Sequence, residues 1–265
     1  RSVKFNIKNN IASISIDQLY KKSIQDSAIK QSLENHDFDE VAIKTSGSGW
    51  ATWMENELED GCLYMNYRGY YGSSGFGSGE INGANNGYMT PFASFITCGT
   101  GDFNGTSLSE DFLRAGSVSN PKGAVAAVGT STTGTHTFFN NIMSMGIFDG
   151  IFPKDLKTAG AAVANGRLSL YWTYPTDPSN RVSIFSHWLN LMGDPGLHLW
   201  TDVPEEISVE VNNNVTWGTN FIDVHVENSN GIGVEDAKIT LLKGDDEIFV
   251  SYFTDAVGNV TIPLE

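Results

Sequence analysis

The residue best placed for chemistry is Cys98, which ends an apolar and β-branched run that begins at Phe92. Such a run, followed at once by Gly99 and Gly101, predicts a buried strand with the thiol at its C-terminal end. Crevices of open α/β sheets lie at that end, and glycines let the backbone approach a ligand closely. Cys98 is therefore a candidate nucleophile. The alternative is a cysteine that packs as a small apolar side chain, because cysteine is among the most buried residue types.

The second cysteine, Cys62, lies near the edge of another predicted strand. Two cysteines do not make a disulfide framework, and a bridge between Cys62 and Cys98 would consume the proposed nucleophile. We therefore expect Cys62 to pack in the core. The histidines are scattered along the chain, so the sequence predicts no metal site, and it calls for no cofactor.

Two cationic side chains are candidates for stabilising a thiolate at Cys98. His136 lies in the polar run after the predicted strand 123–129, where it is either a general base or a loop residue that hydrogen-bonds its neighbours. Arg68 ends a predicted strand beside a glycine turn. It either clamps a substrate carboxylate or plays a structural role, for which Glu80 and Asp102 are the expected partners.

The elements that must position these residues alternate between strands and helices over residues 1–201. Apolar runs predict strands at 11–16, 41–43, 62–67, 92–98 and 123–129, and helical spacing predicts helices at 19–33, 50–58, 107–115, 139–148 and 183–192. Because the strands are apolar on both faces, they indicate an α/β fold with a mostly parallel sheet flanked by helices.

After Trp200 the hydrophobic pattern changes to period two, and Pro204 marks the boundary. Short strands are predicted at 207–211, 221–226, 237–242 and 248–252. This pattern is typical of an all-β immunoglobulin-like sandwich, although the strands are fewer than a full module needs. We therefore expect two domains, an α/β domain at 1–201 and a β-sandwich module at 202–265.

Charge separates the same two segments and limits the partners. Residues 202–265 contain 13 acidic residues and two lysines, so they hold −11 of the formal net charge of −15. Nucleic acid and anionic membrane surfaces are poor partners for such a chain. No apolar stretch has the length of a membrane span. The chain starts at Arg1, without a methionine or a signal-peptide pattern, so we expect a processed or excised form.

Four blocks of the sequence, in this order, resemble the gingipain-type cysteine peptidases, which share a fold with caspases and legumains. They are 62–69, 92–103, 110–115 together with 123–133, and 191–197 together with the linker 203–204. Each motif alone is weak, and the ordered set is more specific. The resemblance covers roughly residues 25–265. It implies a caspase-like peptidase domain whose N-terminal part would precede Arg1, so the rest of its own precursor is a possible partner.

The resemblance also implies roles for individual residues. Cys98 would be the nucleophile of a secreted or cell-surface endopeptidase that takes a peptide or protein substrate. The loop that contains Thr135 and His136 would line the substrate pocket, with Thr135 binding the substrate. His136 is the substitute for a missing catalytic base.

One departure from the family matters. Where the family carries its catalytic histidine, this sequence has Tyr70, or Tyr71 if one residue is inserted. A neutral tyrosine cannot easily take a thiol's proton at neutral pH. It can still donate a hydrogen bond to an oxyanion, as can the backbone of the turn that starts at Gly69, and Gly99 is a further candidate for this role.

Three functions stay open on this basis. The first is a secreted thiol endopeptidase that uses Cys98, and the retained cysteine block places it first. The second is a catalytically degenerate relative that binds peptides or serves as a structural part of a secretion machine or surface protein. The third is an export or adhesion module in which the β-sandwich is the functional part.

Overall fold

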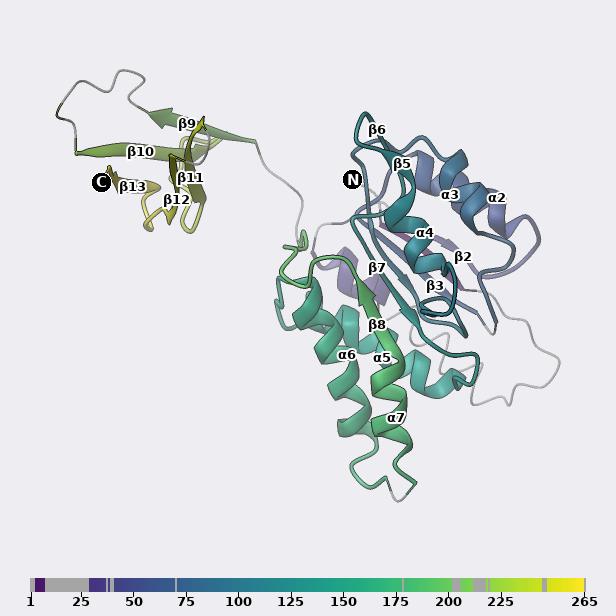
Figure 1. The fold of residues 1–265 in the computed structure, drawn as a ribbon. Coiled ribbons are helices and arrows are strands. Elements are labelled where there is room, and N and C mark those ends of the chain that lie inside the picture. The colour runs from purple at the N-terminus through teal and green to yellow at the C-terminus, as the bar shows by residue number, and fades with distance from the viewer. Residues whose placement is uncertain are drawn as a thin grey trace. The chain divides into compact units, whose positions relative to one another are not determined.

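The computed structural model describes residues 3–7, 29–36, 38, 41–69, 71–177, 179–201, 206–211, 218, 220–244 and 247–264. The chain divides into two compact units, Arg1–Val203 and Pro204–Glu265 (Figure 1). Each unit has its own hydrophobic core.

The first unit is built on a six-stranded sheet with the order β2-β1-β3-β4-β7-β8. Its strands are β1 (Val3–Ile7), β2 (Val41–Lys44), β3 (Tyr64–Arg68), β4 (Phe92–Phe95), β7 (Ala126–Thr130) and β8 (Leu189–Met192). All neighbours pair in parallel except β8, which runs antiparallel to β7. The predicted mostly parallel sheet is confirmed.

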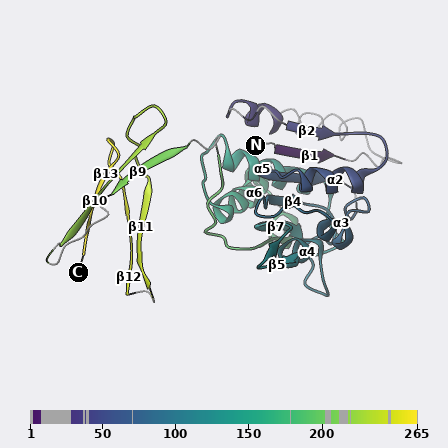
Figure 2. The ribbon, with the colours of Figure 1, turned by 90° about the horizontal axis from the view of Figure 1, so that it is seen from above.

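Helices cover both faces of this sheet (Figures 1 and 2). One face packs against α2 (Trp50–Glu59), α3 (Ser78–Gly83) and α4 (Leu108–Arg114), and the other against α5 (Thr137–Ile151), α6 (Ala159–Thr173) and α7 (Arg181–Trp188). A short hairpin of β5 (Gly116–Ser117) and β6 (Asn120–Pro121) follows α4. Every residue of β3 is buried, as expected for a strand covered on both faces.

Strand alternation decides which side chains reach the α5 face. Tyr64 and Phe92 pack in the core beneath α5, whereas Met65 and Tyr67 pack in the core on the α2–α4 side. Because the side-chain period of a strand is two, Arg68 lies on the same face as Tyr64. The alternation therefore brings the end of β3 to the first turns of α5.

Some predicted elements differ from the observed ones. Leu189–Met192 was expected to continue a helix, but it is the edge strand β8, because its backbone pairs with β7. The helices α3 and α6 were not predicted. In α6 the small residues that hide the helical pattern permit close packing, since a Cβ on Gly166 would lie 2.8 Å from the carbonyl oxygen of Met143 on α5. The strand predicted at 11–16 lies outside the described residues, as does most of the helix at 19–33, of which 29–34 is helical.

The second unit consists of antiparallel strands in two sheets. They are β9 (Ile207–Val211), β10 (Phe221–Asn228), β11 (Lys238–Lys243), β12 (Ile248–Phe253) and β13 (Asn259–Pro263). The orders are β13-β10-β9 and β11-β12. Ile222, Val224, Val226 and Ile262 form the buried core. The four predicted strands are present, and β13 is an additional one.

Candidate functional site

The candidate site lies where β3 and β4 end. Cys98 follows β4, and its backbone forms a parallel bridge with that of Tyr71, in the turn after β3. Neighbouring strands are about 5 Å apart, so this turn lies beside the cysteine. Cys98 is partly exposed and Tyr71 is 68% exposed. Tyr70 lies outside the described residues.

A set of buried threonines fixes the backbone around Cys98. The Thr97 hydroxyl donates to the carbonyl oxygen of Gly72 at 2.8 Å and so ties the two strand ends together. The hydroxyls of Thr100 and Thr130 both donate to the carbonyl oxygen of Thr97. Since these threonines are almost completely buried, their hydrogen bonds satisfy groups that water cannot reach. The thiol therefore stands on an ordered loop.

Gly99 serves the turn rather than an oxyanion. Its φ of +72° is in the left-handed region that favours glycine, and its N–H donates to the carbonyl oxygen of Thr132 at 2.9 Å. Because this N–H already has a partner, the expected donation from Gly99 to an oxyanion does not fit the structure. The turn after β3 is the remaining candidate for that role.

Tyr67 supports the turn after β3 from the α2–α4 face. Its ring is buried, its hydroxyl hydrogen-bonds the Ser74 hydroxyl at 2.5 Å, and a Cβ on Gly69 would lie 2.3 Å from that Tyr67 oxygen. Burial raises the pKa of Tyr67, against smaller opposing effects of the Ser74 hydrogen bond and the Arg68 charge. The phenol therefore stays neutral at physiological pH, and Gly69 is required by packing.

The contact partner of the thiol is Thr135. The Sγ atom of Cys98 lies 3.0 Å from the Thr135 hydroxyl, which also accepts a hydrogen bond from the side-chain amide of Asn140 at 2.9 Å. Asn140 lies in the first turn of α5 and is 3% exposed. The sequence placed Thr135 in the site through the family resemblance, as a substrate-binding residue, and did not indicate Asn140.

His136 is the N-cap of α5. Its Nδ1 accepts a hydrogen bond from the Phe138 N–H at 3.3 Å, and the two rings stack with centroids 5.4 Å apart. The side chain is exposed. This bond satisfies one of the N–H groups that the first turn of a helix leaves without an intrahelical partner. In the structure, Thr135 contacts the thiol and the neighbouring His136 caps the helix.

Arg68 is buried and anchors α5 to β3. Its guanidinium donates to Asn141 Oδ1 from Nε at 3.1 Å and from Nη2 at 2.7 Å, and Nη2 also reaches the carbonyl oxygen of Thr137 at 3.5 Å. Only 1% of the residue is exposed. Binding of a substrate carboxylate by Arg68, one of the two roles predicted from its place at a strand end, conflicts with this burial, because the group is held inside the unit.

The acidic partners expected for Arg68 are engaged elsewhere. The Glu80 carboxylate accepts from the Gly77 N–H at 2.9 Å and caps α3. The Asp102 carboxylate accepts from the Asn104 N–H at 3.0 Å and closes a local turn. The expected pairing of Arg68 with these two carboxylates was therefore wrong, and the Asn141 amide on α5 is one of the groups that the guanidinium contacts instead.

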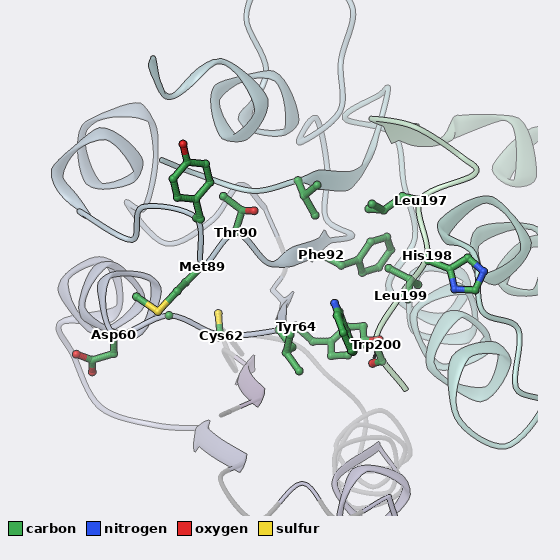
Figure 3. Close-up of a pocket in the computed structure, with 14 residues that line it drawn as sticks. Asp60, Cys62, Tyr64, Met89, Thr90, Phe92, Leu197, His198, Leu199 and Trp200 are labelled. Carbon is green, nitrogen blue, oxygen red and sulfur yellow. Dashed lines mark hydrogen bonds between the residues drawn. The ribbon is translucent and has the colours of Figure 1, made fainter. Parts of the chain in front are cut away.

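Cys62 lies at the opposite edge of the sheet. It is buried, and it forms no disulfide with Cys98. The residue lines a cavity of about 350 Å³ between the starts of β3 and β4, and Figure 3 shows Met89, Phe92 and Trp200 among the side chains around it. Sequence reasoning missed this pocket because segments near 61, 89 and 199 build it together.

Two negative findings apply to the described part of the chain alone. Among those residues, no cluster of three or more His, Cys, Asp or Glu side chains could hold a metal ion. None of the described helices combines the length and the apolar character needed to cross a membrane.

A comparison with known protein families identifies the family of the chain. Residues 2–200 match the model of peptidase family C25. The chain therefore belongs to this gingipain-type family of cysteine peptidases. Among curated proteins no relative was found.

Solved structures confirm the fold. The chain is similar to the Arg-specific cysteine proteinase gingipain R (RgpB), with 18% identity, a TM-score of 0.76, and coverage of 99% of this chain and 60% of that one. The same identity and TM-score hold for a complex of the RgpB pro- and mature domains of Porphyromonas gingivalis, with coverage of 99% and 62%. A further protease structure matches at 13% identity and a TM-score of 0.72, with coverage of 98% and 60%. The chain thus spans about three fifths of these neighbours.

Proposed function

We propose that the protein is a secreted or cell-surface cysteine endopeptidase that uses Cys98 as its nucleophile. The observation that carries the proposal is a partly exposed thiol at the carboxyl edge of the sheet in a C25 domain, fixed by a threonine network and in contact with a hydroxyl. Such edges are where ligands of α/β sheets bind. A peptide or protein is the proposed substrate.

In the proposed reaction, the Cys98 thiolate attacks the carbonyl carbon of the scissile peptide bond and forms a tetrahedral intermediate. Its collapse breaks the carbon–nitrogen bond, and the leaving amine takes a proton from a general acid. Water then hydrolyses the thioester. The backbone of the turn that contains Gly69 and Tyr71 is the proposed oxyanion donor.

His136 is the proposed proton carrier. It is adjacent to Thr135, whose hydroxyl contacts the sulfur, and it is exposed, so its ring can exchange protons with water. To reach the sulfur, the imidazole must leave the Phe138 N–H that it now caps. Catalytic hydrogen bonds often form only when substrate is bound, so this rearrangement is part of the proposal.

A second candidate function is peptide binding without turnover in the same crevice. The sequence favours it by placing tyrosines where the family carries its histidine, and the structure favours it by engaging His136 in the cap of α5. The proposal extends to two further features. Residues 202–265 would form an immunoglobulin-like module, and the rest of the precursor would be a partner, as the pro-domain is for RgpB in its complex.

The test is hydrolysis of a fluorogenic peptide library by the purified chain. Cys98→Ala should abolish hydrolysis, and His136→Ala should lower the rate about 100-fold, as loss of a general base usually does. His187→Ala is the matched control, because His187 is also exposed and hydrogen-bonds within its own helix. Wild-type protein that binds peptides from the library but hydrolyses none would establish the second function instead.

A further inference from the structure

A chain of two hydrogen bonds runs from Asn140 through Thr135 to the sulfur of Cys98. We refer to it as the relay. We propose that Thr135 and Asn140 stabilise the Cys98 thiolate, with Thr135 donating its hydroxyl proton to Sγ and Asn140 acting as the positioning residue for that hydroxyl. The inference rests on the proposed function only in using Cys98 as the reactive group. It supplies a neutral hydrogen-bond donor to the sulfur, which in cysteine nucleophiles is often stabilised by a histidine.

The direction of the relay follows from the donors that are present. A threonine hydroxyl has one proton to donate and two acceptor lone pairs. The Asn140 amide N–H donates to Thr135 Oγ1 at 2.9 Å and so occupies one lone pair. The hydroxyl proton remains, and Cys98 Sγ lies 3.0 Å from the oxygen. The Thr135 proton is therefore available to a negatively charged sulfur.

The burial of Asn140 keeps its side-chain amide within hydrogen-bond distance of Thr135. The residue is 3% exposed, and its Oδ1 has no hydrogen-bond partner among the described residues. An unsatisfied buried carbonyl oxygen costs stability. The amide N–H of Asn140 points to Thr135. In this orientation the Thr135 hydroxyl proton is left for the sulfur.

Helix α5 holds the relay in place. The backbone N–H of Asn140 donates to the carbonyl oxygen of His136 at 3.0 Å, so Asn140 belongs to the first hydrogen-bonded turn. The His136 side chain caps that same turn. Since α5 is also fixed to β3 through Arg68 and Asn141, the amide is presented from a rigid element.

Other titratable or charged groups lie on the elements around the thiol. They are Arg68 at the end of β3, Tyr71 in the turn after it, Asp102 in the loop after Cys98, and His136 before α5. None of these four is a member of the relay. Removing the Thr135 hydroxyl therefore leaves these four side chains in place and isolates its contribution.

The experiment measures the rate of Cys98 alkylation by iodoacetamide between pH 5 and 10, with mass spectrometry of the Cys98 peptide. Thr135→Val should alkylate about tenfold more slowly at pH 7, because it loses a hydrogen bond to a charged group. Its limiting rate at high pH should match the wild type, since access to the sulfur is unchanged. Thr135→Ser should restore the wild-type profile, and Asn140→Leu should show a smaller shift in the same direction.

Thr133→Val is the matched control, because Thr133 is an exposed threonine of the same loop. Its profile should match the wild type. If Thr135→Val fails to fold by circular dichroism, Thr135→Ala takes its place, with Thr135→Ser again as the rescue. Coinciding profiles for wild type and Thr135→Val would overturn the relay, as would a Thr135→Ser profile identical to that of Thr135→Val.

The outcome separates the relay from the proposed function, because alkylation needs no peptide substrate. A shifted profile in a protein that hydrolyses nothing would support the relay and refute the peptidase. Peptide hydrolysis by a protein whose alkylation profiles do not shift would support the peptidase and refute the relay.

Discussion

The two cysteines lie at opposite ends of the strands β3 and β4, and their surroundings differ. We call the side of the sheet where these strands end the carboxyl edge, and the side where they start the other edge. At the carboxyl edge Cys98 is partly exposed and contacts the Thr135 hydroxyl. At the other edge Cys62 is buried in a hydrophobic core and lines a cavity of mixed polarity, with Met89 and Phe92 among its apolar residues. The same residue type is thus placed in a polar, ordered loop at one edge and in a hydrophobic core at the other.

The difference follows from what approaches each edge. Parallel strands that end together meet the loop before α5, which brings hydroxyls, amides and the N-terminal turn of a helix to Cys98. At the starts of β3 and β4, the chain returns with Leu197 and Trp200, whose side chains are apolar and line the pocket beside Cys62. A reactive thiol needs donors and access, and the described structure supplies both at the Cys98 edge.

The largest loss of stability is expected when the buried hydrogen bonds between Arg68 and Asn141 are removed. Arg68→Met should lower the free energy of unfolding by about 2–3 kcal/mol, because it leaves the buried Asn141 Oδ1 without its donor. Urea denaturation measures this loss. The control Arg181→Met, at an exposed arginine, should stay within about 0.5 kcal/mol of the wild type.

A double variant sharpens this test. Adding Asn141→Leu to Arg68→Met should recover part of the lost stability, since both partners are then apolar. If Arg68→Met alone is as stable as the wild type, the anchoring of α5 by Arg68 is refuted.

The two cysteines should also differ in their tolerance of serine. Cys62→Ser should cost about 1–2 kcal/mol, since it puts a hydroxyl into an apolar core. Cys98→Ser should cost less than about 0.5 kcal/mol, since Thr135 can hydrogen-bond the new hydroxyl. Thermal unfolding of the two variants measures the difference. Equal costs would show that the two edges are not chemically distinct.

A smaller effect than that of Arg68→Met is expected at Tyr64, beside the Cys62 pocket. Its hydroxyl donates to the carbonyl oxygen of Trp200 at 2.5 Å, so Tyr64→Phe should cost about 1 kcal/mol at pH 7. Unfolding at pH 7 measures this cost. The control Tyr71→Phe changes an exposed ring at the Cys98 edge, and its free energy of unfolding at pH 7 should match that of the wild type.

The same variant should reverse its effect in alkali. Burial raises the pKa of Tyr64 well above its ordinary value of 10.0. A raised pKa means that the stability tied to the neutral phenol is present below pH 10.0 and is lost as the pH rises toward the folded-state pKa. Wild-type stability should therefore fall faster above pH 10 than that of Tyr64→Phe. Parallel pH curves would contradict this account.

Much of the sheet could be predicted from the sequence because β3, β4 and β7 are apolar on both faces. The position of Cys98 at a strand end followed from the same pattern. The antiparallel strand Leu189–Met192 could not be recognised, since its apolar residues also fit a helix and only pairing with β7 decides between the two. The small residues of α6 hid that helix for a similar reason, because they reflect close packing against α5.

The contacts of the site depend on tertiary structure and were less predictable. Arg68 was expected to pair with Glu80 or Asp102, but it donates to Asn141, which is 73 residues away in the sequence and reaches β3 because α5 packs against it. His136 was expected to face the thiol, and the structure places the preceding residue, Thr135, on the sulfur. A shift of one residue in a loop changes which side chain points inward, and hydrophobic periodicity does not report it.

The comparison of the two edges is tested most directly by the relative reactivity of the two cysteines in the folded wild-type protein. The native chain is treated with iodoacetamide at pH 7, and mass spectrometry follows each cysteine peptide over time. Alkylation of Cys98 should be at least about tenfold faster than that of Cys62, because one thiol is accessible and the other is buried. Equal rates, or faster alkylation of Cys62, would contradict the assignment of the Cys98 edge as the reactive site.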